Sequence, residues 1–445
     1  TIVLFFFSSL RHFLIQSSAL DLAFFDQIIY LASQGKPPIS TLLGFHLIGD
    51  HSAFILYLIA LPYRLLPNVH WLFFIQAFAL SLGAFPLYNL SLHLKLSKQY
   101  ALTIAIAYLL YPAIFNINFY TDFRPETIAV PAFIWSVLAA YKNQKLWFIF
   151  SILVALSCKE ILSLNVIFLG IWLGIFKKKT KYGITAVMIG VIWLSITFGY
   201  IVPFYRGGKA GGINFYQSLG NSFTEILATL ITRPYLLLQK LFLPDSLFYC
   251  ILVLLPLLLI VNWRKATILI PAFPTFILNI LSDYSAQRDL IHHYSLPILP
   301  FLFIWAIESI QSFQSDEAET IRKWISYKII IMWSIFNFMI LAKYSYFYTR
   351  YTSELDTWSS TRKAISLIST TDSLLTMNQI APHLSHRKVI KIVKHETESI
   401  KLNQFHYLLL NLRHSGLTSN REAVEKLNDR VAKSEDFELI FDRTG

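Results

Sequence analysis

Carboxylates, imidazoles and cations recur in short polar segments between long apolar runs. The first such segment, Asp21–Gln27, holds two carboxylates at the start of a stretch that we expect to form a short amphipathic helix through Leu31, lying at the membrane interface. A carboxylate at a membrane surface can act as general base toward a hydroxyl. The alternative is an Asp that caps the helix N-terminus, which requires no catalysis.

A second segment places Asp50 next to His51, just before an apolar stretch at 52–66. An Asp beside a His can bind a metal ion or orient the imidazole. The alternative is again a cap at the start of the stretch that follows.

In a third segment, Asp122 and Glu126 flank Arg124, and Pro125 is placed to begin the next helix. The planar guanidinium of Arg matches the oxygens of a phosphate or pyrophosphate. The alternative is a local ion pair, which contributes little to stability if it is exposed.

Lys159 and Glu160 interrupt the apolar region 145–176. An unpaired charge is costly at membrane depth. We therefore expect a tight turn between two short spans, with the pair close to the external face. The two residues either pair with one another or line a polar cavity.

Two further segments carry cations and imidazoles near predicted spans. Tyr205–Lys209 offers Arg206 on a glycine-containing loop, and Arg288–Tyr294 places His292 and His293 at the mouth of a span. Binding of an anionic headgroup and proton transfer are the functional interpretations. Interfacial anchoring by Tyr, Arg and His is the alternative.

Composition identifies the surroundings of these residues. The chain has 445 residues, of which 55% are hydrophobic and 14% charged, and its mean hydropathy is +0.53. A soluble domain carries roughly 25% charged residues. Apolar runs approaching the roughly 20 residues needed to cross a bilayer recur from Thr1 to about Tyr346. The composition predicts a polytopic α-helical membrane protein and excludes an ordinary soluble enzyme.

The net charge of +12 does not indicate nucleic-acid binding, because many Lys and Arg residues lie in short loops where they set topology. Cys158 and Cys250, the two cysteines, both lie in apolar segments, so no disulfide framework or Cys-based metal site is expected. Residues 1–15 are interpreted as a first membrane helix rather than a cleavable signal. The sequence leaves open whether residues are missing at either end.

We expect about eleven membrane crossings. The stretch 52–66, which contains Pro62 and Arg64, is expected to be interfacial or re-entrant instead. The predicted spans are 1–15, 70–92, 99–117, 127–141, 145–158, 161–176, 182–203, 246–263, 266–281, 295–311 and 326–346.

Loop charges predict the orientation of these spans. Cations cluster after every second span, and the positive-inside rule makes that side cytoplasmic. The N-terminus is then inside, and the C-terminal domain and the candidate residues are outside. The cations used are Lys95, Lys98, Lys142, Lys145, Lys177, Lys178, Lys179, Lys181, Arg264, Lys265, Arg322 and Lys323.

The composition changes near residue 349, and residues 349–445 are expected to form a small extracytoplasmic α/β domain beside a membrane domain at 1–348. Its strands and helices alternate, and its apolar strands fit a covered sheet. No Gly-rich phosphate loop is present, so nucleotide binding has no support. The expected elements are helices at 361–369 and 421–434 and strands at 373–377, 389–393, 407–412 and 437–441.

The chain resembles a large family of predicted bacterial membrane proteins, domain of unknown function 2079, over nearly its whole length. One departure is Arg124, where we expect His: a cation is kept, but the proton-transfer ability of an imidazole is not. The segments that carry the resemblance are Phe25-Asp26-Gln27, Leu47-Ile48-Gly49-Asp50-His51, Asp122-Phe123-Arg124-Pro125-Glu126, Cys158-Lys159-Glu160, Pro203-Phe204-Tyr205-Arg206-Gly207, His293-Tyr294 and Ala381-Pro382-His383-Leu384-Ser385-His386-Arg387.

That family is similar in layout to GT-C class membrane glycosyltransferases, which use polyprenyl-phosphate sugars, generally invert at the anomeric carbon, and carry an essential Asp in a long first external loop. The resemblance implies that Asp26 is the catalytic base. It implies that Asp50, Asp122 and Glu126 are second-rank acids or metal ligands, and that the lipid phosphate is held by Lys159, Arg124, Arg206 and His293. The other candidate substrate-binding residues are His51, Glu160 and His292.

The hypothesis is therefore an inverting glycosyl transfer on the outer face of a bacterial cytoplasmic membrane. A divalent metal ion is a candidate cofactor, although no ligand spacing demands one. The partners are membrane lipid, a polyprenyl-phosphate-linked sugar donor, and a glycan, lipid or protein acceptor. The alternatives are a transporter or flippase of an anionic lipid or polymer, and a non-catalytic assembly protein of the membrane.

Overall fold

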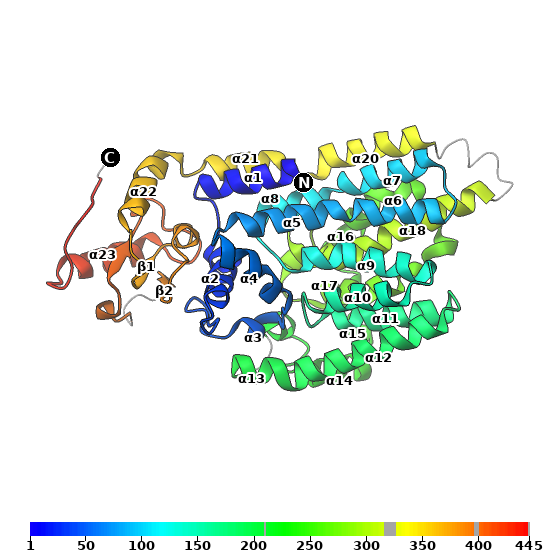
Figure 1. Cartoon of the computed structure of the whole chain (residues 1–445), viewed down its shortest axis with the longest axis horizontal. Helices are drawn as coiled ribbons and strands as arrows, with labels where there is room; N and C mark the ends of the chain where they lie inside the picture. Colours follow the sequence, from blue (N-terminus) through cyan, green and yellow to red (C-terminus); the bar gives the residue numbers. More distant parts are fainter. Residues whose placement is uncertain (209–210, 316–325, 396–399, 444–445) are drawn as a thin grey trace. The chain divides into compact units, whose positions relative to one another are not determined.

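Helices make up most of the chain in the computed structural model, which describes residues 1–208, 211–315, 326–395 and 400–443 (Figure 1). Lys209, Arg322 and Lys323, used above, lie outside these residues. The α-helices are α1 Ile2–Phe13, α2 Phe24–Ser33, α3 Leu47–His51, α4 Ile55–Leu65, α5 His70–Leu82, α6 Ala84–His93, α7 Lys98–Leu109, α8 Pro112–Tyr120, α9 Glu126–Tyr141, α10 Lys145–Leu156, α11 Leu162–Ile175, α12 Thr180–Ile196, α13 Val202–Arg206, α14 Phe223–Thr232, α15 Tyr235–Leu241, α16 Pro244–Leu254, α17 Phe273–Leu281, α18 Leu299–Ser315, α20 Tyr327–Leu341, α21 Tyr344–Thr352, α22 Leu355–Leu367 and α23 Arg421–Ala432.

Shorter helical turns extend or link these helices. Two have π-helical hydrogen bonding, and the others are of 3-10 type. They are η1 Ala19–Ala23, η2 Thr197–Ile201, η3 Gly211–Tyr216, η4 Leu255–Ile260, η5 Trp263–Ala272, η6 Ser285–Gln287, η7 His293–Ile298, η8 Ala381–His383 and η9 Leu402–Gln404.

By length and composition, six helical segments among the described residues can cross a membrane, or seven if one bent pair counts as a single span. The bent pair, Tyr235–Leu241 with Pro244–Ile260, changes direction by 70°. The six others are His70–His93, Lys98–Tyr120, Thr180–Arg206, Trp263–Leu281, His293–Gln314 and Tyr327–Thr352. Each matches a predicted span.

Four other predicted spans correspond to shorter apolar helices: α1, α9, α10 and α11. The count of eleven crossings is thus not confirmed and stays a prediction. The stretch 52–66 forms α4, whose 11 residues span roughly 16 Å at 1.5 Å per residue, too short to cross the bilayer. The predicted break at Lys159 and Glu160 is confirmed, because α10 ends at Leu156 and α11 begins at Leu162.

The described chain divides into two compact units. The larger unit contains residues 1–4, 48–55 and 74–343, and the smaller unit contains residues 5–47, 56–73 and 344–445. The C-terminal part of the smaller unit begins close to the predicted boundary at 348/349. The unit also includes α2 and most of α4, which the sequence assigned to the membrane domain. The two-domain division at 348/349 stays a prediction.

Glycines allow α11 and α12 to pack closely within the larger unit (Figure 1). A Cβ atom added to Gly183 would lie 2.7 Å from the carbonyl oxygen of Gly170 and 2.9 Å from the Cα of Gly174. These neighbours are backbone atoms, which cannot rotate away. Small residues at such contacts let membrane helices approach and gain van der Waals contact, since lipid supplies no hydrophobic force between helices.

A three-stranded parallel sheet forms in the smaller unit, in the order β2-β1-β3. Its strands are β1 Leu374–Thr376, β2 Ile390–Ile392 and β3 Tyr407–Leu409, in the places of three predicted strands. The helices expected at 361–369 and 421–434 appear as α22 and α23. Leu374 and Leu375 of the central strand are fully buried, which explains its apolar run.

The strand predicted at 437–441 is wrong. These residues are described and form no strand. Leu439 and Ile440 are 77% and 70% exposed, so the alternating apolar pattern has no sheet neighbour to pack against. Local β propensity alone does not make a strand, because pairing and burial decide it.

The glycine contact gives a test of the α11–α12 packing. We expect Gly183→Ala to destabilise the protein by about 1–3 kcal/mol, because the methyl group meets backbone atoms. Gly174→Ala is the matched control: its Cβ would meet only the Cα of Gly183 at 3.9 Å, and Ala is favoured over Gly in a helix by about 1 kcal/mol. Thermal unfolding in detergent measures both, and equal midpoints for the two variants would contradict the packing.

Candidate functional site

The larger unit holds a buried ionic cluster centred on Glu126. The Lys159 Nζ lies 2.6 Å from Glu126 Oε1, and the His293 Nε2 lies 3.7 Å from the same oxygen. Glu126 begins α9, Lys159 lies in the α10–α11 turn, and His293 begins η7. All three side chains are largely buried. A carboxylate at a helix N-terminus is favoured by the helix dipole.

Gln76 holds the turn that leads into α9. Its side-chain amide donates hydrogen bonds to the carbonyl oxygens of Thr121 and Asp122, at 3.0 and 3.2 Å. Its side-chain oxygen accepts one from the backbone N–H of Arg124, at 2.9 Å. Asp122 is 1% exposed. The segment predicted to recognise phosphate is therefore held in place by Gln76, a residue that no sequence motif singled out.

A second set of charges continues the cluster. The His51 Nδ1 lies 3.4 Å from Glu160 Oε1, and its Nε2 lies 3.6 Å from Asp50 Oδ2. Arg206 Nη1 is 3.5 Å from Asp50 Oδ1. The backbone N–H of Glu160 donates to the carbonyl of His51, which joins the α10–α11 turn to the end of α3. Asp50 and His51, neighbours in sequence, thus contribute to the same cluster.

Lys159 and Glu160 do not form the mutual ion pair that was one alternative from the sequence, because Lys159 pairs with Glu126 and Glu160 pairs with His51. The Oε2 atom of Glu160 is buried and has no hydrogen-bond partner among the described residues. This oxygen can accept a hydrogen bond but receives none from the described residues. The cavity-lining interpretation of Glu160 stays a prediction.

Neighbouring carboxylates raise the pKa of two of these groups. Burial lowers the pKa of the Lys159 ammonium, but the Glu126 and Glu160 carboxylates outweigh it, so the net pKa is raised above the usual value. Burial likewise opposes protonation of His51, and Lys159 adds to that effect. Asp50 and Glu160 overcome both and raise the pKa of His51. The acidic side chains of the cluster therefore favour the protonated forms of Lys159 and His51.

Asp26 lies at the centre of a separate arrangement in the smaller unit. Its Oδ1 accepts a hydrogen bond from the hydroxyl of Tyr63 at 2.7 Å. Its Oδ2 accepts one from the hydroxyl of Ser385 and lies 3.0 Å from the Nε2 of His386. The carboxylate is 1% exposed. The His386 ring stacks on Tyr30, with centroids 4.5 Å apart and planes 5° apart.

Asp26 does not cap α2, the alternative that sequence analysis kept open. The residue before α2, Ala23, makes no side-chain cap, and both Asp26 oxygens contact side chains instead. Sequence reasoning missed Tyr63, Ser385 and His386 as its partners. The segment Ala381–Arg387 was noted for its family resemblance, which was the one available signal.

Gln27 holds this arrangement in place. Its side-chain amide donates to the carbonyls of Arg387 and Lys388 at 3.2 and 3.3 Å, and its oxygen accepts from Ser40 at 3.0 Å. The hydroxyl of Thr41 donates to the carbonyl of Ile390 and accepts from its N–H. These neutral hydrogen bonds fix α2 and the segment that carries His386.

A family model described as "Predicted membrane protein (DUF2079)" matches residues 11–445. The chain belongs to this family. It is an integral membrane protein, as the family description and the apolar helices agree. A search of curated proteins found no match.

Two solved structures similar to this member of the family are crystal structures of ArnT from Cupriavidus metallidurans. One, bound to undecaprenyl phosphate, has a TM-score of 0.47 and 11% sequence identity. The other, in the apo state, has a TM-score of 0.45 and 12% identity. In both comparisons the match covers 88% of this chain and 85% of ArnT.

His292 and Arg288, two further residues of the predicted polar segments, contact residues that are near them in the sequence. The His292 Nδ1 lies 2.7 Å from Asp289 Oδ2, and the Asp289 Oδ1 accepts from the backbone N–H of His292, so the pair forms a capped turn. Arg288 donates to the carbonyls of Asn279 and Ser282 at the end of α17. Its contacts are those of a helix C-cap.

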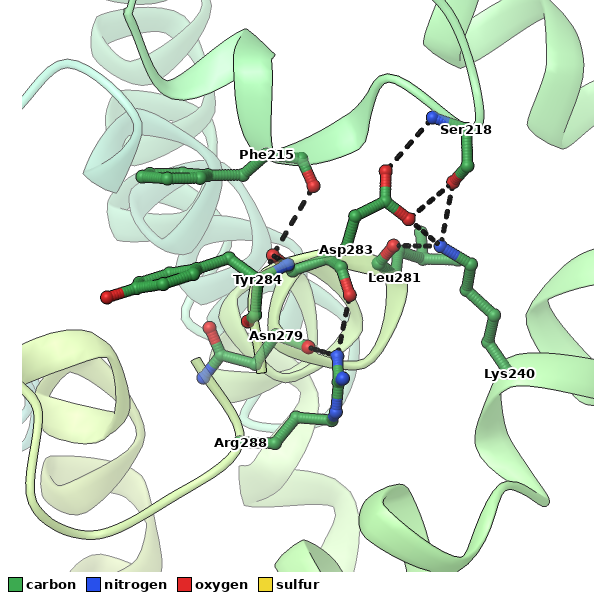
Figure 2. A network of polar contacts seen from close by, with 9 residues as sticks. Phe215, Ser218, Lys240, Asn279, Leu281, Asp283, Tyr284 and Arg288 are labelled. Carbon is green, nitrogen blue, oxygen red and sulfur yellow. Dashed lines mark hydrogen bonds and ion pairs between the residues drawn. The ribbon is translucent and has the colours of Figure 1, made fainter. Parts of the chain in front are cut away.

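A polar network fastens the loop after η3 to the end of α17 (Figure 2). The Lys240 Nζ contacts the Ser218 hydroxyl, the Leu281 carbonyl and Asp283 Oδ1 at 2.6–2.9 Å. Asp283 also accepts from the backbone and hydroxyl of Ser218. Although partial burial acts against it, hydrogen bonding to Lys240 and Ser218 keeps the pKa of Asp283 below its usual value. Sequence analysis did not identify this network.

Among the described residues, no group of three or more His, Cys, Asp or Glu side chains has an arrangement that could hold a metal ion. The carboxylates of the ionic cluster face cations instead of one another. The described part of the chain thus contains no ligand set for the divalent ion considered from the sequence.

The Lys159–Glu126 pair predicts a specific pattern of stability. We expect Lys159→Met to cost about 3–5 kcal/mol, because it leaves a buried carboxylate unpaired. Adding Glu126→Gln removes that charge and should recover much of the loss. Thermal unfolding in detergent measures this, with Lys181→Met, at an exposed site, as control. A double variant no more stable than Lys159→Met would contradict the pairing.

A close backbone approach at Gly49 predicts a second effect. A Cβ atom there would lie 2.7 Å from the carbonyl oxygen of Tyr205 and 2.9 Å from the backbone N of Arg206. We expect Gly49→Ala to cost about 1–3 kcal/mol by forcing α3 and α13 apart. Gly199→Ala, whose Cβ would have nothing within 4 Å, is the control. Unfolding midpoints that match for the two variants would argue against this contact.

Proposed function

We propose that this protein is a membrane glycosyltransferase. It moves a sugar from a polyprenyl-phosphate donor to an acceptor hydroxyl on the outer face of a bacterial cytoplasmic membrane, with inversion. The observation that carries the proposal is the buried cluster of the larger unit. There, Lys159, Arg206, His51 and His293 gather with acidic residues where helices begin and end, in a chain whose solvent is mostly lipid.

The cations suit the leaving group of such a reaction. When the bond from the anomeric carbon to the phosphate oxygen breaks, negative charge develops on that oxygen. Lys159 and Arg206 would stabilise the charge, Arg124 would contribute to the same field, and His293 would contact the phosphate as a neutral imidazole. Ionisable groups buried in a membrane protein are costly, so their presence in number favours a functional role over anchoring.

Glu126 would hold the site ready in the absence of donor. An unpaired ammonium among apolar helices is costly, and the 2.6 Å contact with Glu126 keeps Lys159 protonated and in place. A bound phosphate competes with this carboxylate for the same ammonium. Donor binding therefore exchanges one ion pair for another, which limits its net electrostatic gain.

We assign general-base catalysis to Asp26 together with the side chains that contact it. A carboxylate in contact with two hydroxyl groups and an imidazole has the groups that general acid–base catalysis uses. The acceptor is a glycan, lipid or protein that offers a hydroxyl group. In this proposal the C-terminal domain is extracytoplasmic.

A transporter or flippase of an anionic lipid is the second candidate. The specific observation in its favour is the 70° bend between α15 and α16, together with the 3-10 segments η4 and η5 in apolar stretches. Broken helices of this kind form substrate sites in many transporters. Substrate accumulation in sealed vesicles would favour transport, and product formation in detergent would favour the enzyme.

The first experiment measures transfer from a panel of radiolabelled polyprenyl-phosphate sugars by purified protein. We expect Asp26→Asn to lower the rate by about 10²–10⁴-fold, the usual contribution of general base catalysis. Asp21→Asn, in the same segment, is the matched control and should remain active. Unchanged transfer by the Asp26 variant would refute the base assignment. Failure of the folded wild-type protein with every donor would shift the assignment toward transport.

A further inference from the structure

Asp26 is poorly placed to meet an acceptor directly. Its carboxylate is 1% exposed, and each oxygen already contacts a neighbouring group. A hydroxyl group arriving from outside has no open oxygen of Asp26 to approach. The partners of Asp26 therefore block its direct access to substrate.

His386 has the access that Asp26 lacks. Its side chain is 31% exposed, while its Nε2 lies 3.0 Å from Asp26 Oδ2. Tyr30 stacks on one face of the ring, and Tyr63 meets it edge-on with centroids 6.1 Å apart. No hydrogen bond from the described part of the chain reaches its Nδ1. The ring is fixed in orientation, and one nitrogen remains available.

We propose that His386 takes the proton from the acceptor hydroxyl at Nδ1, while Asp26 orients the imidazole and stabilises the imidazolium that forms. This proposal rests on the proposed glycosyl transfer. The O–H bond of the acceptor breaks and its proton moves to Nδ1. The acceptor oxygen forms a bond to the anomeric carbon, and the phosphate leaves with the electron pair of the old bond. The imidazolium then returns its proton to water.

The surroundings of the imidazole support this role. Burial acts to lower the pKa of His386, but the Asp26 carboxylate outweighs it and raises the pKa above the usual value. A base whose pKa lies close to the working pH is the most efficient. Tyr63 and Ser385 each donate a hydrogen bond to Asp26 and hold its carboxylate in place. Asp26 acts through His386 and is therefore a positioning residue.

A purely structural tie between α2 and the His386 segment is the simpler alternative. Gln27 and Thr41 already make that tie with neutral hydrogen bonds. A buried carboxylate adds a desolvation cost that a structural tie does not need. A role in orienting the His386 imidazole accounts for the presence of a carboxylate at this buried position.

The test compares wild type, His386→Gln, His386→Ala and Asp26→Asn in the transfer assay with an active donor, with equal unfolding midpoints as the folding check. The matched control is His406→Gln, a histidine of the same unit whose Nδ1 lies 3.1 Å from the Ser373 hydroxyl. We expect His386→Gln to lower kcat at least 100-fold with little change in KM. Exogenous imidazole should restore part of the activity of His386→Ala, which a structural role would not produce.

The pH profile supplies a second readout. Protonated His386 cannot accept a proton, so activity should fall at low pH, with the midpoint above the usual histidine value. The titratable groups that contact this ring are Asp26, Tyr30 and Tyr63. Removing the charge in Asp26→Asn should move the midpoint of the residual activity to lower pH. If the pH midpoint of activity is the same in Asp26→Asn and in wild type, Asp26 does not influence His386 and the proposal is overturned.

The outcomes separate the two levels of the proposal. Transfer by wild type that survives in His386→Gln but not in Asp26→Asn would overturn the role of His386 and leave the glycosyltransferase intact. No transfer by wild type from any donor would overturn both. Loss in both variants, with imidazole rescue of His386→Ala, would support the dyad.

Discussion

The contact between Lys159 and Glu126 is the constraint around which the larger unit is arranged. An ammonium and a carboxylate removed from water need each other at close range, and their 2.6 Å separation leaves little freedom. To form this ion pair, Glu126 is placed at the start of α9, and Lys159 is placed in the turn that separates α10 from α11. The helix boundaries in this region thus follow from one electrostatic requirement.

The same requirement explains why neighbouring polar residues are buried and ordered. Gln76 fixes the turn before α9, and the carbonyl of His51 accepts from the backbone of Glu160, so several loops converge on the ion pair. The resulting cluster lies at helix ends, where unpaired backbone N–H and C=O groups add their own partial charges. A buried polar region forms among apolar helices in this way.

The sequence predicted the features that depend on local pattern. Apolar length located the spans, and the cost of burying charge located the turn at Lys159 and Glu160. It could not predict partners brought together from distant segments: nothing near Asp26 indicates that Tyr63 and His386 contact it. The strand expected at 437–441 failed for the complementary reason, since a correct local pattern lacked the neighbour that makes a strand. The roles of the predicted site residues remain predictions.

The smaller unit has a consequence for biosynthesis. Gln27 bonds to the carbonyl of Arg387, 360 residues later in the chain. At roughly 5–20 residues per second, the ribosome needs about 20–70 s to make the second partner after the first. During that interval α2 is synthesised but lacks the segment that covers its polar side chains, while the apolar helices between them enter the membrane. The Asp26 and Gln27 side chains of α2 therefore have only their early hydrogen-bond partners, Ser40, Thr41 and Tyr63, until residues 385–388 are made. A nascent chain truncated before residue 385 would leave Asp26 without two of its three partners.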